Sequence, residues 1–113
     1  MKKPKPPSHL SPDTSVWWRS VVKDYALEPH HLRLLTLAAE SWDRCTQARE
    51  ALAQDGICFR DDRGNVRSHP AVSIEKDSRI AFARLIREMD LDTEPPPTNR
   101  FGPRSLASNS GRR

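Results

Sequence analysis

The chain has 113 residues and a formal net charge of +4, and 30% of its residues are charged while 6% are aromatic. This length permits one small domain. No apolar run approaches the roughly 18 residues that a membrane span requires. The lysine- and proline-rich start is not followed by the apolar stretch of a signal peptide. The composition therefore predicts a small cytosolic protein without membrane association.

The positive charge is concentrated at the two ends of the chain. Residues 1–10 contain three lysines and no acid, and residues 95–113 contain four arginines and no acid. Residues 11–94 contain 12 basic and 15 acidic residues. This distribution favours flexible arms that attract a polyanion over a basic groove in the body, although solvated linkers are an equally good interpretation. The candidate DNA-binding residues are Lys2, Lys3, Lys5, Arg100, Arg104, Arg112 and Arg113.

A first helix is predicted from about Ser11 to Tyr25. Ser11 can cap the free backbone N–H groups, and Pro12 suits the first helical position. Apolar residues recur at helical spacing and include the adjacent Trp17 and Trp18. Because neighbouring side chains on a helix cannot both face fully inward, one of these tryptophans is a candidate for a subunit interface.

A second, long helix is predicted from about Pro29 to Gln54, ending before Gly56. A heptad-like seam of three- and four-residue steps is formed by Leu35, Ala38, Trp42, Cys45 and Leu52, with Arg49 interrupting it between the last two. The start of this helix is apolar on more than one side, so we expect it to touch a helix of the same chain and a second subunit. Both cysteines, Cys45 and Cys58, are expected to be reduced and buried.

A β-hairpin is predicted at about residues 57–68. Two short apolar runs flank the segment 61–65, in which Gly64 and Asn65 tolerate the backbone of a tight turn. An isolated hairpin is only marginally stable, so it must pack on the helices or pair with another copy. An alternative DNA surface on this hairpin, weakened by the neighbouring Asp61 and Asp62, consists of Arg60, Arg63 and Arg67.

A third helix is predicted from Pro70 to about Met89, with Glu75 and Arg79 as an i,i+4 ion pair on its outer surface. For the three tryptophans of the chain, core packing is favoured over stacking on bases. The residues expected in the core or at a subunit interface are Trp17, Trp18, Leu35, Trp42, Cys45, Leu52, Phe59, Ile80 and Leu85.

The sequence offers no candidate catalytic site. It contains no Gly-rich phosphate loop and no GxSxG or HExxH motif. His30 and His31 are adjacent at the start of a helix, where surface exposure is favoured over a general-base role. The cysteines and histidines do not combine into a zinc site. We therefore expect a non-enzymatic protein that uses no cofactor and no metal.

These elements predict a mainly α fold of three helices, one of them long, with a short β-hairpin between the second and third helices. The expected organisation is a disordered basic arm (1–10), a helical oligomerisation core (11–92) and a disordered tail rich in proline and arginine (93–113).

The order of the elements over residues 10–92 resembles the small terminase subunit of tailed double-stranded-DNA phages. The matching segments are LSPDTSVWWRSVVKDYALEPHHLRLLTLAAESWDRCTQAREALAQDG, the link ICFRDDRGNVRSHP, and AVSIEKDSRIAFARLIREMDLD. The specific part is a helix ending in glycine, a strand-turn-strand ending in His-Pro, and an amphipathic helix ending in Leu-Asp.

This resemblance implies a non-enzymatic protein that forms a homo-oligomeric ring in the cytoplasm of a bacterial host. Such a subunit binds double-stranded viral DNA for packaging and delivers it to a large subunit, which holds the ATPase and nuclease. A different hypothesis is a helical adaptor that docks another protein and does not bind DNA.

Overall fold

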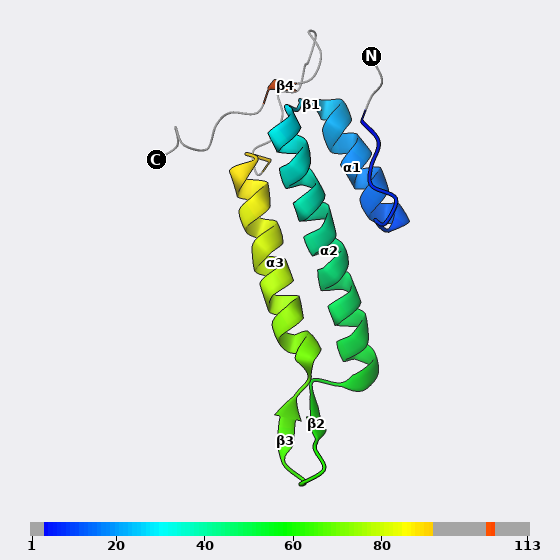
Figure 1. Cartoon of the computed structure of the whole chain (residues 1–113), viewed down its shortest axis with the longest axis vertical. Helices are drawn as coiled ribbons and strands as arrows, with labels where there is room; N and C mark the ends of the chain where they lie inside the picture. Colours follow the sequence, from blue (N-terminus) through cyan, green and yellow to red (C-terminus); the bar gives the residue numbers. More distant parts are fainter. Residues whose placement is uncertain (1–3, 92–103, 106–113) are drawn as a thin grey trace.

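The computed structural model describes residues 4–91 and the backbone of residues 104–105 (Figure 1). The helices are α1 (Pro12–Asp24), α2 (Pro29–Asp55) and α3 (Pro70–Glu88). The antiparallel hairpin between α2 and α3 consists of β2 (Cys58–Arg60) and β3 (Val66–Ser68). A two-residue parallel pair joins β1 (Tyr25–Ala26) to β4 (Arg104–Ser105). The predicted mainly α fold, with its three helices and its hairpin, is confirmed.

The helices begin and end at local signals in the sequence. A proline occupies the first position of all three helices. The Ser11 hydroxyl accepts a hydrogen bond from the Thr14 N–H at the start of α1, and the His69 ring accepts one from the Ala71 N–H at the start of α3. After α2 the backbone turns at Gly56, whose φ of 82° is readily adopted by glycine. These signals explain why the predicted helix ends agree with the structure within one or two residues.

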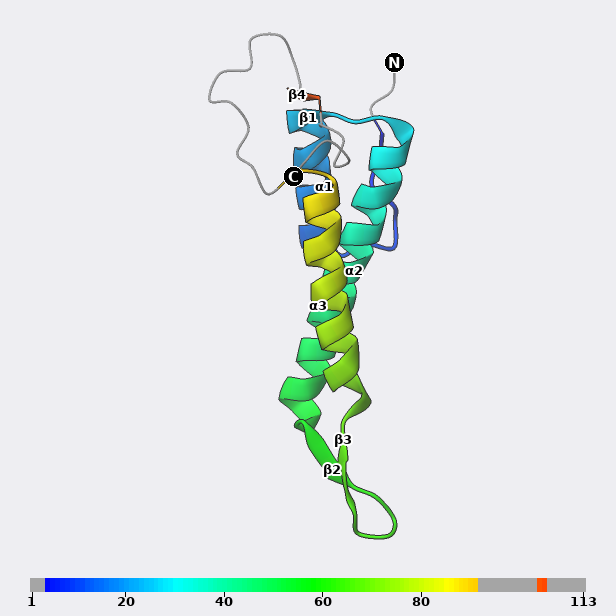
Figure 2. The same cartoon turned by 90° about the vertical axis from the view of Figure 1, so that its left-hand side faces the viewer.

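The long helix α2 is the centre of the fold. α3 runs antiparallel along it, and α1 lies against its N-terminal half (Figure 1, Figure 2). The expectation that the apolar start of α2 touches a helix of the same chain is therefore confirmed, with two such helices. The buried cluster at this end of the molecule consists of Leu10, Trp18, Val21, Tyr25, Leu35, Ala39 and Met89.

The boundary of the N-terminal arm differs from the expected one. Leu10 is buried in the core cluster, and the ring of His9 lies 2.7 Å from the carboxylate of Glu40 on α2. Leu10 therefore packs with the helices and the exposed His9 contacts α2, so the arm ends before residue 9 rather than at residue 10. Residues 1–3 and 92–103 lie outside the described part of the chain, as do residues 106–113.

The two adjacent tryptophans divide as expected: Trp18 is buried and Trp17 is partly exposed. The interpretation that both cysteines are buried is wrong for one of them, because Cys45 is buried whereas Cys58 lies in an exposed strand. Neither forms a disulfide. The seam residue Trp42 is also not buried, since 46% of it is exposed.

Candidate assembly and DNA-binding surfaces

The start of α1 is attached to the middle of α2 by the side chain of Asp43. Its carboxylate accepts hydrogen bonds from the Ser11 N–H at 2.8 Å, from the Ser11 hydroxyl at 2.8 Å and from the Thr14 hydroxyl. Thr14 is buried and Asp43 is partly buried. One carboxylate therefore holds the first turn of α1 in a fixed position on α2.

These hydrogen bonds also determine the ionisation of Asp43. Its partial burial alone would raise the pKa of the carboxyl group, but the hydrogen bonds from Thr14 and Ser11 favour the charged form and outweigh it. The pKa of Asp43 is therefore lowered, and the carboxylate stays ionised at neutral pH.

An aromatic cleft lies where the three helices meet. The ring of Phe82 on α3 is 5.8 Å from the ring of Trp17 on α1 and 5.0 Å from the ring of Trp42 on α2, measured between centroids. These three rings, with Asp13 and Thr14 of α1, line a hollow of about 210 Å³. The cleft is apolar at its base and has an exposed carboxylate, that of Asp13, at its edge.

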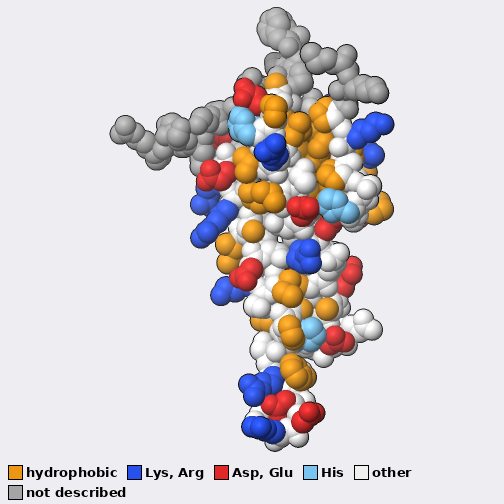
Figure 3. All heavy atoms as spheres, in the orientation of Figure 1, with side chains coloured by type: hydrophobic (Ala, Val, Ile, Leu, Met, Phe, Trp, Pro, Cys, Tyr) orange, Lys and Arg blue, Asp and Glu red, His pale blue; other side chains and the backbone are white. Residues whose placement is uncertain are grey.

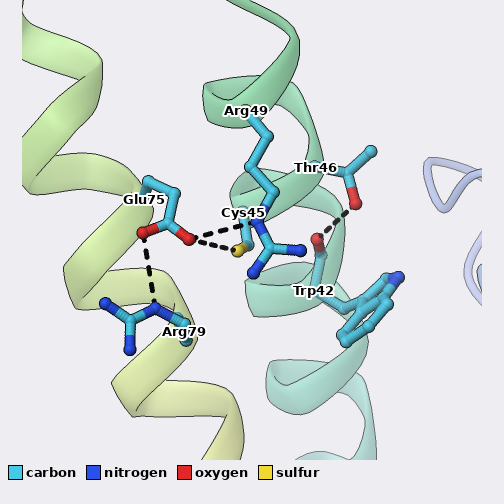
Figure 4. A network of polar contacts seen from close by, with 6 residues as sticks. All are labelled: Trp42, Cys45, Thr46, Arg49, Glu75 and Arg79. Atoms are coloured by element: carbon cyan, nitrogen blue, oxygen red, sulfur yellow. Dashed lines mark hydrogen bonds and ion pairs between the residues drawn. The ribbon is translucent and has the colours of Figure 1, made fainter. Parts of the chain in front are cut away.

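A second polar network connects α2 and α3 on the hairpin side of the cleft (Figure 4). Glu75 points from α3 toward α2, and its carboxylate contacts Arg49 Nε at 3.1 Å, Cys45 Sγ at 3.5 Å and Arg79 Nε at 3.4 Å. Only 17% of the Glu75 side chain is exposed. The ion pair with Arg79 is confirmed, but its expected place on the outer surface is wrong, because Glu75 lies between the two helices.

The same contacts shift the pKa values of the acid and the thiol in opposite directions. The hydrogen bond from Arg49 is the main reason why the pKa of Glu75 is lowered. Burial raises the pKa of the Cys45 thiol, and the neighbouring Glu75 carboxylate adds to this effect. Cys45 is therefore an unreactive thiol in the folded chain.

The hairpin projects beyond the helices, and all six residues of its strands are exposed (Figure 1). The phenyl ring of Phe59 shares a face with its cross-strand partner Arg67. Large apolar side chains stay open to solvent here, with 65% of Ile57 and 62% of Val66 exposed. The hairpin therefore does not pack on the helices of its own chain.

The arginines of the hairpin are partly engaged within it. Arg67 Nε lies 2.9 Å from Asp61 Oδ2, and an Arg60 guanidinium nitrogen donates to the Gly64 carbonyl at 3.0 Å. The hydrogen bond from Arg67 is the first reason why the pKa of Asp61 is lowered. Basic and acidic side chains lie close together at the tip of the hairpin, where Figure 3 shows them as mixed blue and red spheres. The role of Arg60, Arg63 and Arg67 as an alternative DNA surface stays a prediction.

The candidate DNA-binding residues of the two ends fall mostly outside the described residues. Lys5 is exposed. The backbone of Arg104 pairs with β1, close to the end of α1. The role of these residues stays a prediction. The remaining ones, outside the described part of the chain, are Lys2, Lys3, Arg100, Arg112 and Arg113.

The residues predicted for the core or an interface fall into three groups. The buried ones are Trp18, Leu35 and Cys45. The half-buried ones are Trp17, Leu52 and Leu85. The exposed ones, at 39–47%, are Trp42, Phe59 and Ile80. Because the three exposed residues are not in the core of this chain, they are the ones that could lie at a subunit interface. Their place at an interface stays a prediction.

Sequence reasoning missed two residues on which the cleft depends: Phe82, which lines it, and Asp43, which holds α1 on α2. Asp43 had no visible role, because its partners Ser11 and Thr14 are about 30 residues away in the chain. Phe82 was one of several apolar positions on the third helix, and no local pattern shows that it lies between two tryptophans. Phe82 lies seven residues after Glu75, and this spacing places the two residues on the same side of α3. That spacing is the one sequence signal that Phe82 faces α2.

Among residues 4–91, no helix is long and apolar enough to cross a bilayer. The same residues include no cluster of three or more side chains suited to holding a metal ion. The family model described as phage terminase, small subunit, matches residues 16–95, which include all of α2, the hairpin and α3. Searches of curated proteins and of solved structures gave no match. Because the match spans more than half of the sequence, the chain belongs to the phage terminase small subunit family.

Proposed function

We propose that this protein is a non-catalytic subunit of a phage DNA-packaging motor that binds double-stranded viral DNA in the host cytoplasm. It delivers that DNA to the large terminase subunit, which carries the ATPase and nuclease. The observation that carries this proposal is the family match over residues 16–95. The charge distribution supports it, because basic ends on a mildly acidic body suit electrostatic contact with a polyanion.

In this proposal, residues 11–92 form the assembly core of a homo-oligomeric ring. Supporting this, Leu37, Trp42 and Phe59 are each about half exposed, and Ile57 and Val66 are exposed further. Large apolar side chains that stay open to solvent on several elements mark surfaces suited to protein contact. The hairpin serves as an assembly element, because its exposed strands leave backbone groups free to meet a neighbouring subunit.

DNA binding is assigned to the two basic ends. Their seven positive charges have no acidic neighbour within either end, whereas Arg67 of the hairpin is paired with Asp61. Contacts from arms of this kind neutralise phosphates without reading the base sequence, so affinity falls steeply with salt. We therefore propose weak, salt-sensitive and largely non-specific binding.

A mobility-shift titration at low salt tests this assignment. We compare the wild type with a variant in which the seven basic end residues are changed to serine, a choice that leaves His9 and the buried Leu10 in place. The matched control changes Arg60, Arg63 and Arg67 to serine. The end variant should lose most of its affinity and its salt dependence, while the hairpin variant should retain both. Unchanged binding by the end variant contradicts the assignment.

The exposed apolar surfaces also suit an adaptor that docks another protein and does not bind DNA. The same titration separates the two functions. If the wild type never shifts DNA at low salt, while it still co-purifies with a large terminase subunit, the adaptor function replaces the DNA-binding one.

A further inference from the structure

The aromatic cleft has the features of a preformed binding site. Asp43 fixes α1 on α2, which fixes the position of Trp17 relative to Trp42. Phe82 closes the base from the third helix. Nearly half of Trp42 is nevertheless exposed. An indole held open to solvent beside a hollow of about 210 Å³ can accept an apolar side chain without rearrangement of the fold.

A second apolar surface lies on α2 and is lined by Leu32, Arg33, Thr36 and Leu37. We call it the Leu37 patch. Leu37 is 51% exposed at its centre. Arg33 lies one turn before Leu37 and Arg44 two turns after it, so both exposed guanidinium groups fall on the same face of the helix. The Leu37 patch is therefore a shallow, open apolar surface that exposes the Leu37 side chain and is flanked by positive charge.

The cleft and the Leu37 patch lie on different sides of the molecule. Trp42 is five residues beyond Leu37, and at about 100° per residue the two side chains are about 140° apart around α2. One copy of the chain therefore presents the cleft on one side and the patch on nearly the opposite side. Two different surfaces so arranged permit a head-to-tail contact that repeats from copy to copy and can close into a ring.

Charge favours a second copy over DNA as the occupant of the cleft. The carboxylate of Asp13 is exposed at its edge. This negative charge repels a phosphate backbone but attracts the guanidinium groups of Arg33 and Arg44 beside Leu37.

We propose that the Leu37 patch of one copy inserts into the aromatic cleft of the next, forming the head-to-tail contact of the oligomer. Leu37 packs between the rings of Trp17 and Trp42, and Arg33 or Arg44 lies against Asp13. This contact rests on the proposed homo-oligomer and identifies which surfaces meet. The exposed hairpin adds contacts at the far end of the helices.

Two variants that each remove one surface test the contact. Leu37→Glu places a carboxylate in the patch, and Trp42→Ala removes one wall of the cleft. Each alone should fall to the protomer mass of 12.9 kDa in light scattering. An equimolar mixture should form a species of twice that mass, because one intact patch then meets one intact cleft. The matched control Val16→Glu, at an exposed position that lines neither surface, should assemble as the wild type does.

Helical content and urea unfolding show whether each variant is folded. If Trp42→Ala is unfolded, Asp13→Arg replaces it, because that exposed residue changes only the charge at the edge of the cleft. The contact is refuted if Leu37→Glu keeps the wild-type mass, or if the mixture of folded variants stays at the protomer mass. A wild type that is itself monomeric refutes the proposed ring, whereas a wild-type ring unaffected by Leu37→Glu refutes only this contact.

Discussion

Replacing Asp43 with alanine should destabilise the chain far more than a change at a partly exposed residue usually does. The substitution removes the acceptor of three hydrogen bonds that attach the start of α1 to α2. It leaves the Ser11 N–H and two hydroxyl groups without that acceptor, and the Thr14 hydroxyl belongs to a buried residue. A matched control is Glu40→Ala, one turn earlier on the same helix, which removes an exposed contact to His9.

The magnitude follows from the number and charge of these bonds. A hydrogen bond to a charged group contributes about 1.5–3 kcal/mol. Because the three share one carboxylate and water replaces part of the loss, we expect Asp43→Ala to lower the free energy of unfolding by about 2–4 kcal/mol in total. The exposed Glu40 contact should be worth about 0–1 kcal/mol.

Urea unfolding followed by circular dichroism measures both values, and Asp43→Asn adds a test of the charge. The lowered pKa means that the stabilisation by Asp43 is present above the ordinary aspartate pKa of about 4 and is lost as the pH falls below it toward the folded value. The difference in unfolding free energy between wild type and Asp43→Asn should therefore shrink with acidification through that range. A loss by Asp43→Ala no larger than that by Glu40→Ala refutes the reasoning.

Three further predictions concern single residues. Leu35→Ala should cost about 2–5 kcal/mol because Leu35 is fully buried, while Leu37→Ala on the same helix should cost about 0.5 kcal/mol or less in the dissociated chain, both by urea unfolding. Trp42→Ala should cost about 1.5–2.5 kcal/mol, half the usual value for a buried tryptophan, since nearly half of it is exposed; an unchanged midpoint contradicts its packing on Phe82. A thiol reagent should label Cys58 quickly and Cys45 only on unfolding, as mass spectrometry would show; equal rates contradict the burial of Cys45.

The helices and the hairpin could be predicted because their signals are local. A proline at each start, the cap at Ser11 and the glycine after α2 act within a few residues, so the chain reveals them without knowledge of the fold. The apolar face of α2 predicted contact with a helix of the same chain, which the structure confirms. It also predicted contact with a second subunit, which stays a prediction.

The exposure of individual seam residues could not be predicted in the same way. Spacing places Trp42 and Cys45 on one side of α2, but in the fold 46% of Trp42 stays exposed while Cys45 is buried beside Glu75 of α3. Glu75 appeared to suit an outer surface because its i,i+4 partner is close in sequence. Its contact with Arg49 joins two helices through residues that are 26 positions apart in the chain, and no local pattern encodes it.

The same limit applies to the candidate sites. The basic ends are evident from charge alone, but the aromatic cleft requires three helices to bring Trp17, Trp42 and Phe82 together. The role of Asp43 in holding that cleft depends on contacts that form only when α1 folds back on α2.

The mass of the wild-type protein in solution tests the central claim most directly. Light scattering coupled to size exclusion at micromolar concentration should show a single closed oligomer well above a dimer of the 12.9 kDa chain. That mass should not grow with concentration, because a closed ring leaves no free end. A strict monomer under these conditions contradicts the account of this chain as a ring-forming terminase small subunit.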